Sequence, residues 1–416
     1  MKENLILEDK NRPSIEFKNS LEEVLREGAR KLLEQAIENE IQDYIEQFKG
    51  LKTEENRRVV TRNGYLPERF IQTGIGEVLV KQPRVRDKRK DQKFSSQILP
   101  PYLRRTSSLD ALIPALYLKG ISTGDFGEAL EAILGENAKG LSPTNIVRLK
   151  EGWEKDFKEW QGRDLREKQY VYFWVDGIYF NIRLSEDRPC LLVIIGALDN
   201  GKKELVAIHD GVRESKLSWK EVLQDLKIRG LSTPPKLAIG DGALGFWAAL
   251  EEEFTETSEQ RCWVHKTANV LDKMPKRVQT HAKKLVHDIY MAPTKQEGLR
   301  AFDVFIKVYE AKYPKACECL LKDKQELMTF YDFPAMHWQH IRTTNPIEST
   351  FATIRHRTRQ TKGCGSRLAT LTMVYKLAIS AEKHWKRLKG HELISKVIKG
   401  VPFKDGEEVK DQEQIA

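Results

Sequence analysis

The stretch Tyr170-Val-Tyr-Phe-Trp-Val-Asp176-Gly-Ile-Tyr-Phe180 holds a single carboxylate in an otherwise apolar run. Residues 170–175 are aromatic or β-branched, which predicts a strand buried on both faces. A carboxylate at the end of such a strand is costly to ionise unless a partner offsets its desolvation. Asp176 therefore needs a partner, for which a metal ion is the strongest candidate. Asp176-Gly177 is also typical of a two-residue hairpin turn, and this second interpretation stays open.

The segments after Asp176 predict a mixed sheet flanked by helices, and hence an α+β fold. Strand-like runs cover 178–184, 190–198 and 203–209, and a helical pattern covers 215–229. A second apolar run, Lys236-Leu-Ala-Ile-Gly-Asp241, again ends on a carboxylate, and a helix is expected at 243–254. A right-handed crossover would pair the strand ending at Asp241 beside the one ending at Asp176. Both carboxylates would then lie at one sheet edge, where α/β folds place their sites.

A third acid lies near the start of a C-terminal helix. In Asn345-Pro-Ile-Glu348, Asn345 is the expected cap, Pro346 suits the first helical position, and Glu348 falls in the first turn. Glu348, Arg355 and Arg359 are spaced to share one helix face. An adjacent apolar face, expected to pack on the sheet, consists of Ile347, Phe351 and Ile354. The alternative is that Glu348 serves only the helix dipole.

Two aspartates on adjacent strands and a glutamate on a packed helix would make an all-oxygen site. Hard cations such as Mg²⁺ or Mn²⁺ prefer these ligands. Two ions about 4 Å apart would clamp the attacking and leaving oxygens of a phosphoryl displacement. With Arg355 and Arg359 holding backbone phosphates, the arrangement predicts an enzyme that cuts or joins nucleic-acid strands.

Changes of composition and periodicity predict a multidomain chain. The expected segments are a helical, dimerising N-terminal region (1–55), a small basic DNA-contacting module (56–106), a helix-turn-helix-like three-helix region (107–165), a catalytic core (166–264), an all-α insertion (265–335), the C-terminal helices of the core (336–400) and a tail (401–416).

The N-terminal half predicts helices for two different purposes. Residues 15–48 are expected to form a long, acidic amphipathic helix, for which packing on a neighbour or a second subunit is a better expectation than DNA contact. Three short helices are expected within 107–160, the third starting at Ser142-Pro143, with 143–150 as a recognition segment. A generic three-helix bundle is the alternative. A charged linker is expected over 150–168.

Composition bounds the class of protein. The 416 residues are 40% hydrophobic and 31% charged, with a net charge of +9. Residues 336–400 hold 13 Lys and Arg against three Asp and Glu, and 81–90 form a second basic cluster, which favours a polyanion as partner. No run is long enough for a membrane span and no signal peptide is recognisable. Five cysteines without framework spacing predict free thiols and a cytoplasmic location.

Six segments follow one another in a family-specific order: Arg62-Asn-Gly-Tyr65, Gly120-Ile-Ser-Thr123, Val175-Asp-Gly-Ile-Tyr179, Gly240-Asp-Gly-Ala-Leu-Gly-Phe-Trp247, Arg261-Cys-Trp-Val-His265 and Asn345-Pro-Ile-Glu348. As an ordered set, they resemble a Mutator-type transposase of bacterial insertion sequences, in the DDE, ribonuclease-H-like group. The resemblance implies a ribonuclease-H-like core interrupted by the helical insertion. It also implies that Asp176, Asp241 and Glu348 form the metal-binding triad.

The resemblance further implies partners and a reaction. The chain is expected to bind terminal inverted repeats in double-stranded DNA and to carry out transposition, through a circular intermediate, with two Mg²⁺ or Mn²⁺ ions. We expect a homodimer, because two transposon ends must be brought together. The residues expected to contact DNA are Arg62, Arg84, Arg86, Arg355, Arg357, Arg359, Lys362, Arg367, Trp247 and Trp263, the tryptophans by stacking on an unpaired base or, alternatively, lying in the core.

Cys262 and His265 have three possible roles. They match the family's Cys-x-x-His signature, which implies a catalytic place beside the triad, where His265 would donate to the scissile phosphate or orient a carboxylate. They could instead form half of a zinc site with Cys317-Glu-Cys319, although the spacing fits zinc patterns poorly. A buried structural pair is the third alternative.

Three functions stay open at this point. The first is a DDE transposase that cleaves transposon ends and joins the freed 3′ hydroxyl to target DNA. The second keeps the fold but acts as a structure-specific DNA nuclease or resolvase. The third is a DNA-binding regulator without catalysis. Imperfect inverted repeats flanking the reading frame would favour the first.

Overall fold

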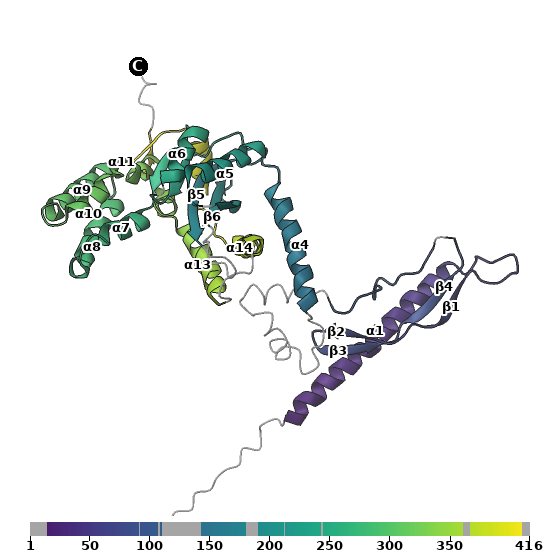
Figure 1. The fold of residues 1–416 in the computed structure, drawn as a ribbon. Coiled ribbons are helices and arrows are strands. Elements are labelled where there is room, and N and C mark those ends of the chain that lie inside the picture. Colours follow the sequence, from purple (N-terminus) through teal and green to yellow (C-terminus); the bar gives the residue numbers. More distant parts are fainter. Residues whose placement is uncertain are drawn as a thin grey trace, which may run out of the picture. The chain divides into compact units, whose positions relative to one another are not determined.

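The computed structural model describes residues 15–90, 92–106, 109, 143–179, 190–211, 213–242, 244–360 and 367–409. The chain forms two compact units, residues 1–149 and 150–416, whose elements are drawn in Figure 1. The fold is mixed α and β, as the sequence predicts. The finer division into segments stays a prediction.

The first unit packs one long helix on short antiparallel strands. Its elements are α1 (Ile15–Gln47), β1 (Val60–Tyr65), β2 (Arg69–Thr73), β3 (Gly76–Val80) and β4 (Pro83–Asp87). Strand β1 pairs with β4 and strand β2 pairs with β3. The predicted helix over 15–48 is therefore confirmed.

The two halves of α1 differ in burial. Ile37 and Ile41, in the second half, are buried against Ile71, Val78 and Val80 of the strands. In the first half, four large apolar side chains are exposed: Leu21, Val24, Leu25 and Leu32. The strands thus account for only part of the amphipathic pattern of this helix.

The predicted helix-turn-helix region is only partly described. Residues 110–142, which hold most of the first predicted helix and all of the second, lie outside the described residues. The third helix begins at Pro143 as predicted, but it continues as α4 (Pro143–Gln161). The expected linker from residue 150 is thus helical as far as Gln161.

The second unit is built on a five-stranded sheet of order β7-β6-β5-β8-β9. The strands are β5 (Tyr170–Tyr179), β6 (Cys190–Leu198), β7 (Lys203–Gly211), β8 (Leu237–Gly240) and β9 (Ser258–Arg261). β5, β6 and β7 run antiparallel, whereas β8 lies parallel to both β5 and β9. The predicted pairing of the two aspartate-bearing strands is confirmed. β9 was not predicted.

The predicted hairpin turn at Asp176-Gly177 is wrong. Both residues lie inside β5, where they pair with Val193 and Leu192 of β6. The apolar and β-branched residues on both sides favour a continuous strand, and neighbouring β6 extends the ladder to Tyr179. The first residues of the strand expected at 178–184 therefore belong to β5, and the rest lie outside the described residues.

Helices cover both faces of the sheet (Figure 1). One face, with Phe173 and Val175, packs against α5 (Lys216–Ile228) and α6 (Leu244–Glu253) in a single apolar cluster. On the other face, the Tyr172 hydroxyl lies 2.7 Å from His337 Nδ1 and the Trp174 indole donates to the His340 carbonyl. α13 (Asn345–Gln360) and α14 (Arg367–Glu382) contact this sheet through β5 and β7 respectively.

The segment expected to be an all-α insertion is helical throughout, including the 3₁₀ turns η1 and η2. Its elements are α7 (Trp263–Leu271), α8 (Lys276–Met291), α9 (Lys295–Tyr309), α10 (Pro314–Leu321), α11 (Lys324–Leu327), η1 (Thr329–Asp332) and η2 (Ala335–His337). The remaining elements are α12 (Trp338–Ile341), η3 (His391–Leu393), α15 (Ile394–Ile398), β10 (Phe403–Lys404) and β11 (Glu407–Glu408). Among the described helices, none combines the length and apolar character needed to cross a bilayer.

Candidate active site

The register of the sheet brings Asp176 and Asp241 to one edge. β5 and β8 are parallel, with Trp174 opposite Ile239. Asp176 lies two residues beyond Trp174, and Asp241 lies two residues beyond Ile239. The two carboxylates thus lie at the same end of two neighbouring parallel strands, β5 and β8. Both side chains are half-buried.

Glu348 lies in the first turn of α13, the helix that contacts β5. Thr344, not Asn345, precedes this helix: its carbonyl accepts from the backbone N–H groups of Ile347 and Glu348, and Asn345 is already helical. The predicted cap is therefore shifted by one residue. The buried Ile347 and Phe351 anchor the apolar face of α13 as predicted, so Glu348 is fixed at the helix start.

One hydroxyl connects Glu348 with the Cys-x-x-His motif. Thr344 Oγ1 lies 3.0 Å from Glu348 Oε1 and 3.3 Å from Cys262 Sγ. A hydroxyl has one proton, so it can donate to only one of these acceptors at a time. The Thr344 backbone N–H also donates to Cys262 Sγ, and His265 Nε2 lies 3.8 Å from Glu348 Oε1. Cys262 and Thr344 are buried, which fixes the geometry of this network.

Hydrogen bonds within this network shift the pKa values of both Cys262 and His265. Burial raises the pKa of the Cys262 thiol, but hydrogen bonds from His265 and Thr344 outweigh burial and bring that pKa below its ordinary value. The hydrogen bond to Cys262 acts against desolvation, and together with the negative charges of Cys262, Asp176 and Glu348 it raises the pKa of His265 to about 9. His265 is therefore a cationic donor at neutral pH.

The zinc interpretation with Cys317 and Cys319 is wrong. Among the described residues, the ligand atoms of Cys262, His265 and Glu348 lie within 4.8 Å of one another, and neither of the other two cysteines belongs to this group. α7, which carries His265, does touch α10, which carries Cys317 and Cys319, but the contact is made by the Lys266 ammonium, which donates to the Cys319 carbonyl.

A fourth carboxylate, Glu214, lies at the same edge and was not predicted. Desolvation and the negative charges of Asp241 and Asp176 raise the pKa of Glu214 to about 7, although His265 acts in the opposite direction. The only sequence signal was its place directly before the helix expected at 215–229. Desolvation is the first cause of this shift, and the field of the two aspartates adds to it. Carboxylate oxygens in such a field are the donors that a hard divalent cation prefers, so the residues present fit such an ion.

Both candidate tryptophans lie in the core. The Trp247 indole donates to the Asp241 carbonyl at 2.9 Å, and the Arg261 guanidinium lies 4.0 Å from its ring centroid. The Trp263 indole is fully buried and donates to the Leu327 carbonyl. These contacts favour the core alternative for both rings, and Trp247 directly supports the backbone at Asp241.

The candidate DNA-contacting cations lie in different surroundings. Arg84 and Arg86 are exposed on β4, whereas Arg62 pairs with Glu38 of α1. Arg367 forms a two-pronged ion pair with Asp210 at 2.7 and 2.8 Å. Arg355, Arg357 and Arg359 belong to α13, and Lys362 lies outside the described residues.

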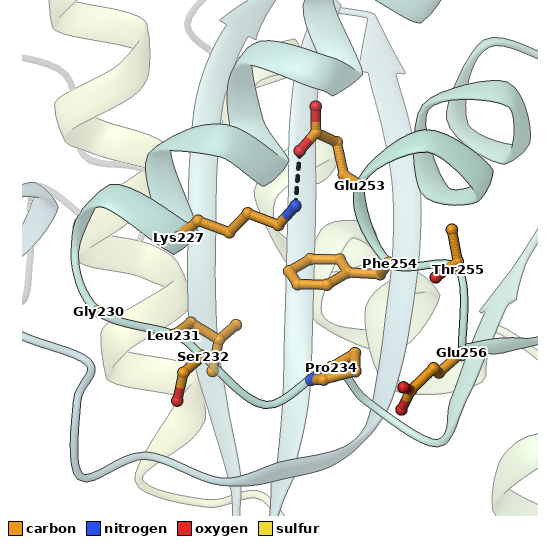
Figure 2. A pocket seen from close by; sticks show the side chains of 9 residues that line it. All are labelled: Lys227, Gly230, Leu231, Ser232, Pro234, Glu253, Phe254, Thr255 and Glu256. Atoms are coloured by element: carbon orange, nitrogen blue, oxygen red, sulfur yellow. Dashed lines mark hydrogen bonds and ion pairs between the residues drawn. The ribbon is translucent and has the colours of Figure 1, made fainter.

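A shallow pocket lies at the opposite end of the sheet, where α5 and α6 end and the chain approaches β8. Its volume is about 410 Å³. Figure 2 shows the Lys227 ammonium paired with Glu253 beside the Phe254 ring, with Leu231 and Pro234 completing the wall. This pocket contains none of the site carboxylates, so we do not assign the chemistry to it.

With this geometry in hand, comparison with known proteins identifies the class. The model of the Mutator family of transposases matches residues 1–388, and the chain belongs to this family. The transposase for insertion sequence element IST2 of Acidithiobacillus ferrooxidans is 52% identical over 279 residues, covering 67% of this chain and 94% of the relative. That for IS6120 of Mycolicibacterium smegmatis is 48% identical over 298 residues, covering 72% and 92%. That for IS256 in transposon Tn4001 of Staphylococcus aureus is 31% identical over 328 residues, covering 78% and 81%.

Proposed function

We propose that this chain is a ribonuclease-H-like DDE transposase that binds the terminal inverted repeats of its element and cleaves and joins DNA strands. The observation that carries the proposal is the parallel register of β5 and β8, which brings Asp176 and Asp241 to one sheet edge. Glu348 joins them through its contact with His265, whose pKa responds to both Asp176 and Glu348. Membership of the Mutator family supports the same assignment.

Asp176, Asp241 and Glu348 would hold two divalent ions, Mg²⁺ or Mn²⁺. When bound, such ions activate the attacking hydroxyl and stabilise charge on the departing oxygen of a phosphodiester. The protein supplies position: the sheet fixes two carboxylates, and Thr344 holds the third by a hydrogen bond. Preorganised ligands of this kind avoid the cost of reorganisation during the reaction.

His265 is suited to assist the displacement. Its imidazolium can donate a hydrogen bond to a phosphate oxygen, because its raised pKa keeps it protonated at neutral pH. Cys262 Sγ accepts hydrogen bonds from the Thr344 N–H and from His265, and so keeps the ring close to Glu348. We therefore assign His265 to phosphate contact and Cys262 to positioning.

DNA would be held by positive charge on both units. Arg84 and Arg86 alternate with partly buried Val85 on β4 and so present two cations on one face of the strand. In the second unit, Arg355, Arg357 and Arg359 would follow Glu348 along α13 and hold backbone phosphates near the cut. Phosphate contacts of this kind position the duplex without reading its sequence.

A second copy of the chain would pack on the exposed first half of α1. Leu21, Leu25 and Leu32 are 62%, 48% and 75% exposed, and their spacing follows one stripe of the helix. Antiparallel pairing centred between residues 26 and 27 would place Leu21 of one copy opposite Leu32 of the other. The same pairing would bring Glu23 of one copy opposite Arg30 of the other.

Asp176→Asn is the direct test of the catalytic assignment. It keeps the side-chain shape but removes the charge, so Mn²⁺-dependent nicking and joining of oligonucleotides that carry the element's end should disappear, while binding to the same DNA persists. Full activity of this variant would refute the assignment. If the wild type instead cleaves branched DNA and forms no joined product, the resolvase alternative applies.

Leu25→Glu combined with Leu32→Glu tests the dimer. The charges would disrupt an apolar contact between copies, so light scattering should show a shift from dimer to monomer with unchanged helix content. Val60→Ala, in the core of the same unit, controls for general destabilisation. A wild-type chain that is monomeric both alone and on DNA would contradict this proposal.

A further inference from the structure

One face of α8, in the helical insertion, concentrates positive charge. Lys276 and Lys283 lie seven residues apart, as do Arg277 and Lys284, and seven residues make nearly two turns of a helix. These four side chains are exposed and form a stripe about 12 Å long, which we call the α8 basic face. The buried residues of the helix lie on its opposite side: Ala282, Val286 and Ile289.

The charges of the α8 basic face are not balanced within the insertion. α8 contains a single acid, Asp288, and none of the four cations forms an ion pair in the part of the chain that the structure describes. The neighbouring lysines of the insertion behave differently: Lys295 and Lys324 pair with Asp332 and Asp303 at 3.0 and 3.4 Å. A row of cations of one sign is complementary to a polyanion.

The C-terminal end of α8 lies beside the candidate active site. α7 begins with Trp263, two residues before His265, and α8 packs along α7 (Figure 1). The Trp263 and Tyr290 rings are 5.2 Å apart between centroids, and the Arg342 guanidinium donates to the Tyr290 carbonyl. Arg342 is two residues before Thr344 of the site network. The α8 basic face thus extends outward along a helix whose last turn is anchored at the site.

α8 is also held firmly at its other end. The Gln279 amide donates to the Leu271 and Met274 carbonyls at 2.9 and 3.0 Å, which fixes the turn between α7 and α8. On the side towards α9, His281 Nδ1 lies 2.7 Å from the Tyr309 hydroxyl. Amide side chains are among those that read base edges, and the amide hydrogens of Gln279 are used within the protein. The exposed cations are therefore suited to phosphates.

We propose that the α8 basic face binds the phosphate backbone of duplex DNA, without regard to sequence, beside the candidate active site. Duplex DNA carries one negative charge per about 1.7 Å of its axis, so a stripe of this length faces several phosphates. Such contacts position the duplex and carry no sequence information. The inference rests on the proposed function, because it places the DNA relative to the same site.

The test is DNA binding by the full-length chain without divalent metal, measured by fluorescence anisotropy. One labelled duplex carries the element's end and a second, of equal length, has an unrelated sequence. Lys283→Gln combined with Lys284→Gln should bind both duplexes roughly tenfold more weakly, because two phosphate contacts are lost. The slope of log affinity against log salt concentration should become shallower by about two, or about one per lost contact.

Two further double variants serve as controls. Lys295→Gln combined with Lys324→Gln removes the same net charge from paired positions of the insertion, and its affinity should stay within twofold of the wild type. Lys283→Arg combined with Lys284→Arg keeps the charge and should bind as the wild type does. Circular dichroism should show equal helix content in all three variants, which separates a lost contact from a lost fold.

The outcomes also separate this inference from the proposed function. Unchanged binding in the Lys283→Gln, Lys284→Gln variant, an equal loss in the Lys295→Gln, Lys324→Gln control, or a loss confined to the end-bearing duplex would each overturn the inference. Strand joining by the Lys283→Gln, Lys284→Gln variant should return to within twofold of the wild type at saturating DNA. If Asp176→Asn joins strands normally, the proposed function fails, whatever the α8 variants show.

Discussion

The two ends of the layer formed by α5 and α6 differ in whether their glutamates form ion pairs with lysines. Away from the site edge, Lys220 and Lys227 lie 2.8 and 2.7 Å from Glu252 and Glu253, and hydrogen bonding to Lys227 holds the pKa of Glu253 below its ordinary value. At the site edge, no lysine in the part of the chain that the structure describes forms an ion pair with Glu214, and the pKa of Glu214 is raised to about 7. The same two helices therefore neutralise negative charge at one end and accumulate it at the other.

This difference shows that the negative charge at the site edge comes from the local arrangement of residues and not from the composition of the chain. The chain is basic overall, with a net charge of +9, so lysines and arginines are not scarce. Where charge serves only packing, exposed lysines pair with the acids and the surface is neutral. Where an ion is expected, mutual repulsion among nearby carboxylates costs stability, which an added cation would restore. The predictions below change one end at a time.

The largest effect is expected for Glu348→Gln. The change removes one ligand charge at the site edge but keeps the hydrogen bond that the side chain accepts from Thr344. Because metal ions contribute several kcal/mol to phosphoryl displacement, strand joining should fall about a thousandfold or more. The measurement is single-turnover joining of end-bearing DNA in Mn²⁺.

Glu252→Gln is the matched change at the neutralised end. It breaks exposed pairs with Lys216 and Lys220, and joining should stay within twofold of the wild type. Equal losses of joining activity in Glu348→Gln and Glu252→Gln would mean that these charges matter only for folding. The difference between the two ends would then be unrelated to catalysis.

Thr344→Val sharpens the comparison with a smaller change at the site edge. It keeps the shape of residue 344 but removes the hydroxyl that lies between Glu348 and Cys262. Loss of a group that orients a metal ligand typically costs about tenfold to a hundredfold in activity or metal affinity. We expect a loss of this size in joining, with a higher Mn²⁺ requirement.

Thr343→Val serves as the control for this variant, since its hydroxyl only accepts weakly from the Asn345 N–H, at 3.4 Å. Joining by Thr343→Val should remain near the wild-type rate. A Thr344→Val enzyme with normal rate and normal Mn²⁺ requirement would show that Glu348 needs no hydrogen bond to hold its place.

The sequence predicts much of this architecture because two patterns are strong: the apolar runs of the strands and the helical spacing of apolar residues in α13. The apolar run before Asp176 and the shorter one before Asp241 predict buried strands, and a right-handed crossover would allow the two to pair side by side. The apolar spacing of Ile347, Phe351 and Ile354 likewise predicts which face of α13 is buried, and all three are. The triad residues could therefore be named from sequence, with their roles still to be tested.

Other features depend on contacts between distant residues, which periodicity does not encode. Gly177 has the sequence of a hairpin turn but serves the approach of Glu214 from a segment far along the chain. β9 is a short polar strand, recognisable only because it pairs with β8. Thr344 becomes the residue before α13 because its carbonyl and hydroxyl are both engaged there.

A third prediction concerns His340, a histidine that the fold keeps uncharged on the face of the sheet opposite α5 and α6. His340 Nε2 accepts from the Lys389 backbone N–H, and desolvation together with the charge of Lys203 lowers the pKa of His340 to about 4. Between pH 6.5 and 4 the unfolded chain binds a proton that the folded chain does not, so stability falls as pH decreases. We expect about 1–2 kcal/mol from this half-buried group after allowance for solvent screening.

Urea unfolding at pH 7 and pH 5 measures this effect. His340→Gln keeps an acceptor for Lys389 but cannot titrate, so its loss of stability on acidification should be smaller than that of the wild type by the stated amount. Identical losses in both proteins would assign the acid sensitivity to carboxylates elsewhere and leave His340 without a part in it.

The smallest effect is expected at the pocket, the neutralised end shown in Figure 2. Lys227→Met removes the ammonium that lies 2.7 Å from Glu253 and 5.1 Å from the Phe254 ring centroid, but keeps an unbranched side chain over the ring. Exposed ion pairs contribute about 0.2–1 kcal/mol, so the free energy of unfolding should fall by no more than that, and less in high salt. Joining activity should not change, because no carboxylate of the site edge lines this pocket. A large loss of activity in Lys227→Met, with stability unaffected, would locate a DNA or ligand contact at this end and contradict the view that its charges only pair with one another.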